Sequence, residues 1–194
     1  MIIHEENHIK NSTADSIPWL SIFNLCYDNP QHLGSTLIRY GISAAELLKI
    51  SEKPIHPSEP YGRKILFKDS KIEVMLAQWS YQAMAHPHNH GHSQGLIWFA
   101  FGDFFEQHFL FRDQNLIPQG EPLFYKEGAV AKVIENDIHS CCPVTEGLSL
   151  HLYTPPIDQM KVWDSINKKT LTLANQCGAW IPENNHLILN STSW

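Results

Sequence analysis

The sequence predicts a mainly β domain, a small barrel with α-helices packed against its outside. From about residue 61 onward, short strand-like runs alternate with turns that contain Gly, Pro and Asp. The first quarter of the chain instead places apolar residues at helical spacing. With 194 residues, 43% of them hydrophobic, the chain is long enough to bury one substantial core. We therefore expect a single domain that spans residues 1–194.

Residues 1–50 form the predicted N-terminal helical segment. Apolar residues recur at helical spacing over 17–27, and a second helix is expected over 30–40. A third helix begins at Ser43, which forms a predicted capping box with Glu46. An extended linker follows, marked by three prolines, Pro54, Pro57 and Pro60.

The barrel is expected over residues 61–175, with residues 176–194 as a C-terminal extension. No internal repeat is present in the sequence. The predicted strands are 64–67, 72–79, 95–101, 104–111, 129–134, 148–153, 160–163 and 170–173.

Composition and charge exclude several classes of partner. The net charge is −6, with no basic face, which argues against nucleic-acid binding. No run of about 18 apolar residues is present, so we expect no membrane span. The four cysteines form no CxxC pair, and we expect no signal peptide, so the protein is predicted to be reduced and cytoplasmic. We also expect a monomer.

The histidine-rich stretch 85–102 carries the clearest functional signal. Alternate residues of a strand share one face, so histidines at spacing two are expected on one side of a strand. Neutral imidazoles suit iron, zinc, copper or nickel. The apolar run 96–101 and a turn at Gly102 follow, which favours a metal at the mouth of the barrel. The four histidines are His86, His88, His90 and His92.

A metal site needs another ligand from elsewhere in the chain, and His139 is the obvious distant candidate. His-x-His, four residues, Gly95, six residues and Gly102 resembles the first cupin motif, with Gly95 where that motif has a Glu ligand. His88 and His90 fit this spacing. The competing choices are the pair His86 and His88, or a histidine-rich surface loop with adventitious metal binding, and His92 is expected to be exposed.

A cupin without the Glu ligand resembles a thiol dioxygenase. Three neutral ligands leave Fe(II) with its full double charge, which favours an anionic thiolate as the next ligand.

A second constellation is the alternation of Ser149, His151 and Tyr153 with two leucines. On a strand the three polar groups share one face, where the serine can bond the histidine and the histidine can orient the tyrosine hydroxyl. The alternative is an amphipathic strand with its polar face in water.

Ser-x-His-x-Tyr-x-Pro-Pro about ten residues after a lone histidine resembles the cysteine dioxygenase family, and the resemblance covers about residues 60–164. It implies a small cupin barrel in which His88, His90 and His139 bind one Fe(II). It also implies oxidation of L-cysteine by dioxygen to cysteine sulfinate. Ser149, His151 and Tyr153 then form a hydrogen-bond relay, and a cis peptide is expected in the turn Thr154-Pro155-Pro156.

The third constellation is Tyr61-Gly-Arg63. An arginine can pair a carboxylate at two points. The resemblance implies that Arg63, helped by Tyr61, holds the carboxylate of the substrate, whereas the motif alone favours a surface arginine. Trp79 falls nine residues before His88, as a family tryptophan does, and is interpreted as cavity wall.

Two departures from the family are visible. Mammalian members carry a cysteine that crosslinks to the active-site tyrosine, and this chain has Gly95 there, which resembles the bacterial branch. The family's His-Asp-His is His-Asn-His here. Cys141 and Cys142, just past His139, are interpreted as small buried residues rather than ligands.

Alternatives to cysteine oxidation are also open. The related substrate 3-mercaptopropionate, or another small thiol, would keep the site and change the pocket. A non-enzymatic metal-binding cupin, acting as a sensor or binding module, would bind metal or ligand without consuming oxygen.

Overall fold

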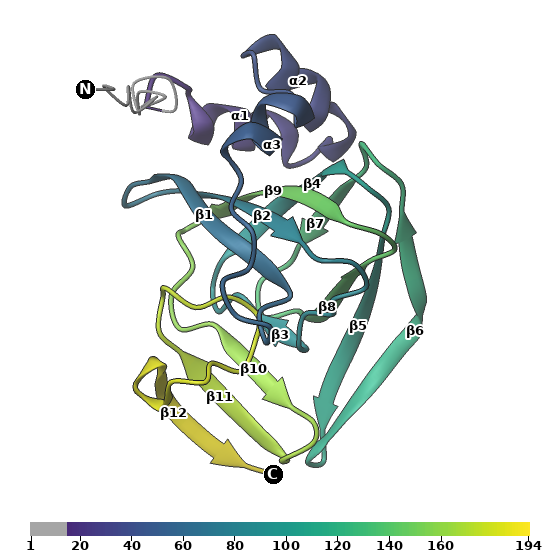
Figure 1. The fold of residues 1–194 in the computed structure, drawn as a ribbon, viewed down its shortest axis with the longest axis vertical. Helices are drawn as coiled ribbons and strands as arrows, with labels where there is room; N and C mark the ends of the chain where they lie inside the picture. Colours follow the sequence, from purple (N-terminus) through teal and green to yellow (C-terminus); the bar gives the residue numbers. More distant parts are fainter. Residues whose placement is uncertain (1–14) are drawn as a thin grey trace, which may run out of the picture.

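Three α-helices lie at the start of the described part of the chain, which in this computed structural model is residues 15–194. Residues 1–14 of the predicted helical segment lie outside the described residues. The helices cover one face of the β-domain (Figure 1). Their bounds are α1 Trp19–Cys26, α2 Leu33–Arg39 and α3 Ala44–Ile50, with a 3-10 turn, η1 Pro30–His32, ahead of α2.

The predicted cap of α3 is present in part. The Ser43 hydroxyl accepts a hydrogen bond from the Glu46 backbone N–H at 3.2 Å. The Glu46 carboxylate bonds the Lys49 ammonium at 2.6 Å instead of closing the capping box. Ser43 therefore starts the helix as expected, through one of the two bonds that the motif offers.

Two antiparallel sheets form the barrel, which confirms the mainly β prediction. The five-stranded sheet has the order β1-β2-β9-β4-β7, and the seven-stranded sheet has the order β12-β11-β10-β3-β8-β5-β6. The strands of the first sheet are β1 Tyr61–Lys68, β2 Glu73–Trp79, β9 Gly147–Thr154, β4 Gln94–Phe101 and β7 Val130–Val133. Those of the second are β12 Ile188–Ser193, β11 Lys169–Leu173, β10 Lys161–Asp164, β3 His88–Asn89, β8 Ile138–Pro143, β5 Phe104–Arg112 and β6 Asn115–Tyr125.

Each of the eight predicted strands has a counterpart, but β3, β6, β8 and β12 were not predicted. β6 is an exposed edge strand with prolines at 118 and 122, so it lacks the alternation of a half-buried strand. β3 spans only two residues. A strand this short leaves no periodic signal in the sequence.

Strand β9 separates two apolar cores. Leu148, Leu150 and Leu152 are fully buried on the side of the helices, where they pack with Trp19 and other residues of α1 and α2. Tyr153 lies in the other core, which is enclosed between the two sheets. Each fully buried leucine stabilises the fold by about 1.5–3 kcal/mol. The alternation of β9 thus serves the helix interface on one face and the barrel interior on the other.

The segment 176–194, expected as an extension, is part of the barrel architecture. It contains η2 Asn185–Leu187 and β12, which pairs with β11 in the seven-stranded sheet. Cys177 and Trp180 pack into the core between the sheets, and the Ala179 N–H donates to the Tyr61 hydroxyl at 2.8 Å. This segment therefore adds an edge strand to the second sheet and covers the core beside Tyr61.

The Thr154–Pro155 peptide is cis, as the family resemblance implied. Among residues 15–194, no helix has the length and apolar character needed to cross a membrane.

Candidate metal centre

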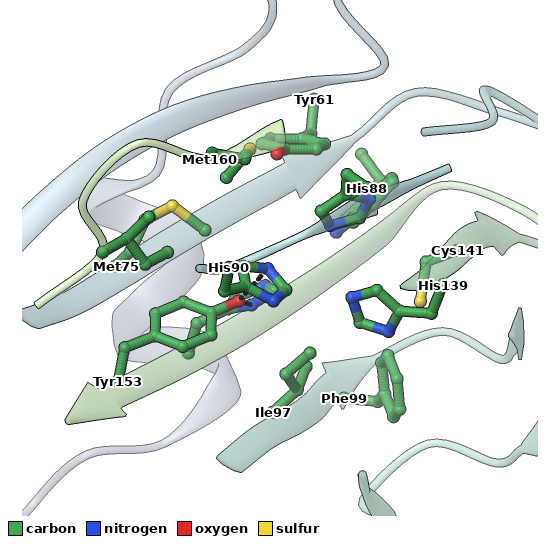
Figure 2. A pocket seen from close by; sticks show the side chains of 13 residues that line it. Tyr61, Met75, His88, His90, Ile97, Phe99, His139, Cys141, Tyr153 and Met160 are labelled. Atoms are coloured by element: carbon green, nitrogen blue, oxygen red, sulfur yellow. Dashed lines mark hydrogen bonds between the residues drawn. The ribbon is translucent and has the colours of Figure 1, made fainter. Parts of the chain in front are cut away.

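Three histidines, one on β3, one directly after it and one on β8, face a common point inside the barrel. β3 pairs with β8, and this register sets His88 directly opposite His139. His90 follows β3, and all three side chains are buried. One ring nitrogen from each lies within 4.8 Å of the other two. Figure 2 shows the three rings converging, as the sequence predicted for a metal site.

The histidine-rich stretch is not one continuous strand, so the expectation of four histidines on one face is wrong. Strand β3 ends at Asn89, and Gly91 turns the chain with a φ of +59°. His92 is 87% exposed and its Nδ1 lies 2.8 Å from Glu135. His86 contributes its carbonyl oxygen, which accepts a hydrogen bond from Nδ1 of His88 at 2.8 Å. His86 and His92 therefore lie outside the triad.

Two of the imidazoles are held neutral, as metal ligands must be, and the third offers a nitrogen without a hydrogen-bond partner. Burial first, and then neighbouring His139, lowers the pKa of His88 well below its usual range. Burial and then His88 lower the pKa of His90 in the same way. Nε2 of His139 and Nδ1 of His90 are buried and have no hydrogen-bond partner among the described residues. Buried nitrogens without partners are rare, and a bound cation would satisfy Nε2 of His139.

Glu106, which the sequence analysis missed, contacts the third histidine. Its carboxylate accepts a short hydrogen bond from Nδ1 of His139, and both side chains are 3% exposed. Glu106 and His108 occupy alternate positions of β5, so both lie on the face of the sheet that their β8 partners Cys141 and His139 share. A carboxylate and an imidazole at alternate positions of an apolar strand were the available signal.

His108 continues this contact toward the surface. Its Nε2 lies 3.5 Å from Glu106 and its Nδ1 lies 2.7 Å from Asp137. The hydrogen bonds to Asp137 and then Glu106 raise the pKa of His108 to about 10. Burial alone would raise the pKa of Glu106, but the hydrogen bonds from His108 and His139 outweigh burial and lower it.

Ser149, His151 and Tyr153 form one hydrogen-bonded line on the inward face of β9. The Ser149 hydroxyl lies 2.7 Å from Nε2 of His151, and Nδ1 of His151 lies 2.8 Å from the Tyr153 hydroxyl. That hydroxyl in turn lies 3.1 Å from Nε2 of His90. The line therefore runs from the wall of the barrel to the histidine triad.

Trp79 gives this line a direction. Its indole N–H, which can only donate, bonds the Ser149 oxygen at 2.8 Å. Ser149 is fully buried, so its own hydrogen needs an acceptor, and within residues 15–194 Nε2 of His151 is the one it contacts. Burial, followed by His139 and Arg63, lowers the pKa of His151 to about 3, so the ring is neutral at pH 7. Its remaining hydrogen is then on Nδ1 and is donated to Tyr153, whose O–H is left to donate onward.

The cavity around these groups is mostly apolar. Besides the triad, His151 and Tyr153, its wall consists of aromatic, aliphatic and sulfur-containing side chains, among which Figure 2 labels Tyr61, Met75 and Met160. Burial raises the pKa of the Tyr61 hydroxyl to about 12 and that of the Tyr153 hydroxyl well above its usual range, so both stay protonated. The remaining wall residues are Tyr61, Met75, Trp79, Ile97, Phe99, Cys141, Ile157 and Met160.

Arg63 lies beside the cavity and is already paired. Its Nη2 donates to the fully buried Glu73 at 2.8 Å, and its Nε lies 3.1 Å from the sulfur of Met75. Arg63 does not line the cavity, whereas Tyr61 and Met75 do. The structure thus puts Tyr61 at the site, and it separates Arg63 from the cavity by the thioether of Met75.

Gly95 and Tyr153 are cross-strand partners in β4 and β9. A Cβ atom at position 95 would lie 2.6 Å from Cδ1 and 2.9 Å from Cε1 of the Tyr153 ring. The ring therefore occupies the space that a side chain at position 95 would need.

The cysteines near the triad are free thiols. Cys141 is buried in the cavity wall with its sulfur 4.0 Å from Glu106, and Cys142 is partly buried. Burial and then Glu106 raise the pKa of Cys141 well above its usual value, so its thiol is protonated. Glu106, His139 and Cys141 form a second group of donor atoms that lie within 4.8 Å of one another. Nδ1 of His139, however, is engaged by Glu106.

Comparison with known proteins gives one family match. A family model described as cysteine dioxygenase type I matches residues 54–166. None of the curated proteins compared with the chain matches it.

Several solved structures resemble the chain at low sequence identity. KdgF from a Halomonas species is 16% identical, with 53% of this chain and 85% of that chain covered and a TM-score of 0.43. An RmlC-like cupin from Shewanella frigidimarina is 18% identical, with coverages of 55% and 86% and a TM-score of 0.44. A Klebsiella pneumoniae protein with a double-stranded β-helix domain is 13% identical, with coverages of 62% and 88% and a TM-score of 0.49.

Proposed function

Because the chain belongs to the cysteine dioxygenase type I family, we propose that it is an Fe(II)-dependent thiol dioxygenase that oxidises L-cysteine to cysteine sulfinate. The reaction adds both atoms of dioxygen to the thiol sulfur, so it needs no other reductant. The observation that carries the proposal is the meeting of two features in one cavity. These are the neutral triad of His88, His90 and His139, and a hydrogen-bond line that ends at Tyr153.

The donor set fits a metal that must bind a thiolate. Three neutral imidazoles leave the full charge of a divalent ion in place, and no carboxylate belongs to the triad. The metal, when bound, would act as a redox-active Lewis acid for a thiolate and dioxygen. The mostly apolar wall around it excludes water, which strengthens polar interactions inside the cavity and limits side reactions.

Tyr153 is the proposed hydrogen-bond donor to the reacting groups. Trp79 and Ser149 orient His151, and His151 orients the Tyr153 hydroxyl, whose hydrogen is then directed away from β9. A metal held by Nε2 of His90 would take up the lone pair that the Tyr153 hydroxyl faces, and would leave this hydrogen for the substrate. The high pKa of Tyr153 keeps the hydroxyl protonated, so it can donate to the substrate while it accepts the hydrogen of His151.

Arg63 and Tyr61 are the proposed carboxylate-binding pair. Arg63 engages Nη2 with Glu73 and Nε with Met75, and its charge acts to lower the pKa values of Tyr61 and Tyr153 against the larger effect of burial. Met75 covers Nε of Arg63, so two-point binding through this nitrogen requires the thioether to move. The Tyr61 hydroxyl accepts the Ala179 N–H, which leaves its own hydrogen for the carboxylate.

The test is oxygen uptake by anaerobically iron-loaded protein, with L-cysteine and with 3-mercaptopropionate in parallel. One mole of sulfinate per mole of oxygen from cysteine supports the proposal. A clear preference for 3-mercaptopropionate would retain the dioxygenase and replace its substrate. No uptake with either thiol, in protein shown to hold iron, would overturn the enzymatic function and leave a metal-dependent binding module.

A further inference from the structure

We propose that Glu106 is a positioning residue for the metal, which fixes the ligating nitrogen of His139 and strengthens metal binding through that ring. This inference rests on the metal site of the proposed function, but not on the identity of the thiol. Among the described residues, Glu106 is the only carboxylate that contacts a member of the histidine triad.

The hydrogen bond from His139 to Glu106 selects one form of the imidazole. A carboxylate can only accept, so Nδ1 of His139 carries the hydrogen and Nε2 keeps its lone pair. Nε2 is the nitrogen that is buried without a partner. The bond thus presents the lone pair inward and prevents rotation of the ring.

His88 and His139 are held by different acceptors. His88 donates its Nδ1 hydrogen to the neutral carbonyl of His86, whereas His139 donates to a carboxylate. A charged acceptor withdraws the hydrogen more strongly and leaves the ring a better donor to a cation. Glu106 thus gives the third ring a carboxylate acceptor, where the first ring has only a backbone carbonyl.

His108 holds the carboxylate of Glu106 in place from the far side. Nδ1 of His108 lies 2.7 Å from Asp137 and its Nε2 lies 3.5 Å from Glu106, so the ring links the two carboxylates. Asp137, His108, Glu106 and His139 thus form one chain of contacts that leads to the metal ligand. Asp137 and His108 are 28% and 27% exposed, so the chain of contacts reaches the surface.

The test measures the dissociation constant of Co²⁺ by competition with a chelator, without thiol or oxygen. We expect Glu106→Gln to weaken Co²⁺ binding about 10- to 100-fold, and to shift the visible absorption of bound Co²⁺ because the His139 ring is reoriented. Glu106→Asp should restore part of the affinity. The matched control is Glu135→Gln, which removes a carboxylate from His92 outside the triad and should leave the affinity unchanged.

Equal Co²⁺ affinity in Glu106→Gln and the wild-type protein would overturn the inference. A purely structural role would lower the melting temperature of the metal-free protein without changing the absorption spectrum or the affinity, and would also overturn it. If Glu106→Gln does not fold, His108→Gln provides the test, with an expected loss of about 3- to 10-fold. Suppose that the wild-type protein binds Co²⁺ but its iron-loaded form oxidises no thiol. This result would refute the proposed activity and leave the role of Glu106 standing. Wild-type protein that does not bind Co²⁺ would refute both.

Discussion

The indole nitrogen of Trp79 lies 2.8 Å from the hydroxyl oxygen of Ser149, seventy residues away in the sequence. β2 and β9 are neighbours in the sheet, and both side chains face the barrel interior. Trp79 is therefore part of the cavity wall and also the donor that orients the hydrogen bonds from Ser149 through His151 to Tyr153. The direction of these bonds depends on the pairing of β2 with β9, and not on the three residues of β9 alone.

Replacing Trp79 with Phe keeps an aromatic wall and removes the donor. The Ser149 hydroxyl is then free to donate or accept, so Tyr153 loses its fixed orientation. We expect kcat for thiol oxidation to fall about 10- to 100-fold, with KM changed less than about twofold. Trp180→Phe is the matched control, because Trp180 also packs on Tyr61, at 5.3 Å between ring centroids, but does not bond Ser149. A rise in KM at constant kcat would contradict this role.

Replacing Arg63 with Lys keeps a positive charge beside Glu73 and removes the planar fork. We expect KM for a thiol carboxylate to rise about 10- to 100-fold, because the two-point hydrogen bonding is lost. Iron content, measured after gel filtration, should not change. Lys64→Gln removes the neighbouring cation, which pairs with Glu52 at 3.1 Å, and serves as the control. Loss of iron in Arg63→Lys would show that Arg63 supports the metal centre instead of the substrate.

Replacing Gly95 with Ala places a methyl group against the Tyr153 ring. Because the Cβ would lie 2.6 Å from Cδ1, the ring or strand must shift, and we expect a loss of about 1–3 kcal/mol in the free energy of unfolding. Urea denaturation of the metal-free protein measures this loss. The same substitution in a Tyr153→Leu background should cost less, since the ring is absent. An equal cost in both backgrounds would place the conflict elsewhere.

The carboxylate of Asp164, which lies outside the metal site, should make the stability of the protein depend on pH. Its carboxylate accepts hydrogen bonds from the backbone of Ile166 and Asn167 and from the Asn167 amide. Burial opposes the charge, but the bonds from Asn167 outweigh it and lower the pKa below its ordinary 3.8. A lowered folded-state pKa stabilises the protein above the unfolded-state value, and this stability is lost as the pH falls through the folded-state pKa.

We therefore expect Asp164→Asn to cost about 1–2 kcal/mol at pH 7, measured by urea denaturation. The difference from wild type should persist down to about pH 4 and shrink below it. Asp113→Asn, at an exposed carboxylate that is 84% accessible, is the control. A difference that stays constant to pH 2 would show that the charge of Asp164 is not what stabilises this turn.

Much of the fold could be predicted because its signals are local. Helical spacing over residues 17–27 anticipated α1, and Ser43 marked the start of α3. Alternation of Ser149, His151 and Tyr153 anticipated the polar face of β9. What was missed depends on pairing between distant strands. Nothing in the sequence near His139 indicates that β5 lies beside it and supplies Glu106.

The histidine-rich stretch also shows that sequence spacing alone does not tell which side chains come together. Its spacing predicted one strand with four aligned side chains, but the chain turns at Gly91 and only the middle pair joins the triad. Local periodicity identified the chemistry, and tertiary pairing with β8 and β10 decided which histidines face inward. Trp79 was correctly expected near the cavity, yet its donor role required its distance to Ser149 to be known.

The alternation of β9 also limits how this gene can change. Substitutions can exchange one leucine for another apolar residue on the helix side without touching the cavity. A single-codon insertion or deletion within residues 147–154 would instead turn every later side chain of the strand through to the opposite face. Leucines would then enter the cavity, and His151 or Tyr153 would be driven against the helices. In-frame length changes in this strand should therefore be absent from functional descendants, although point changes at Leu148, Leu150 and Leu152 can accumulate.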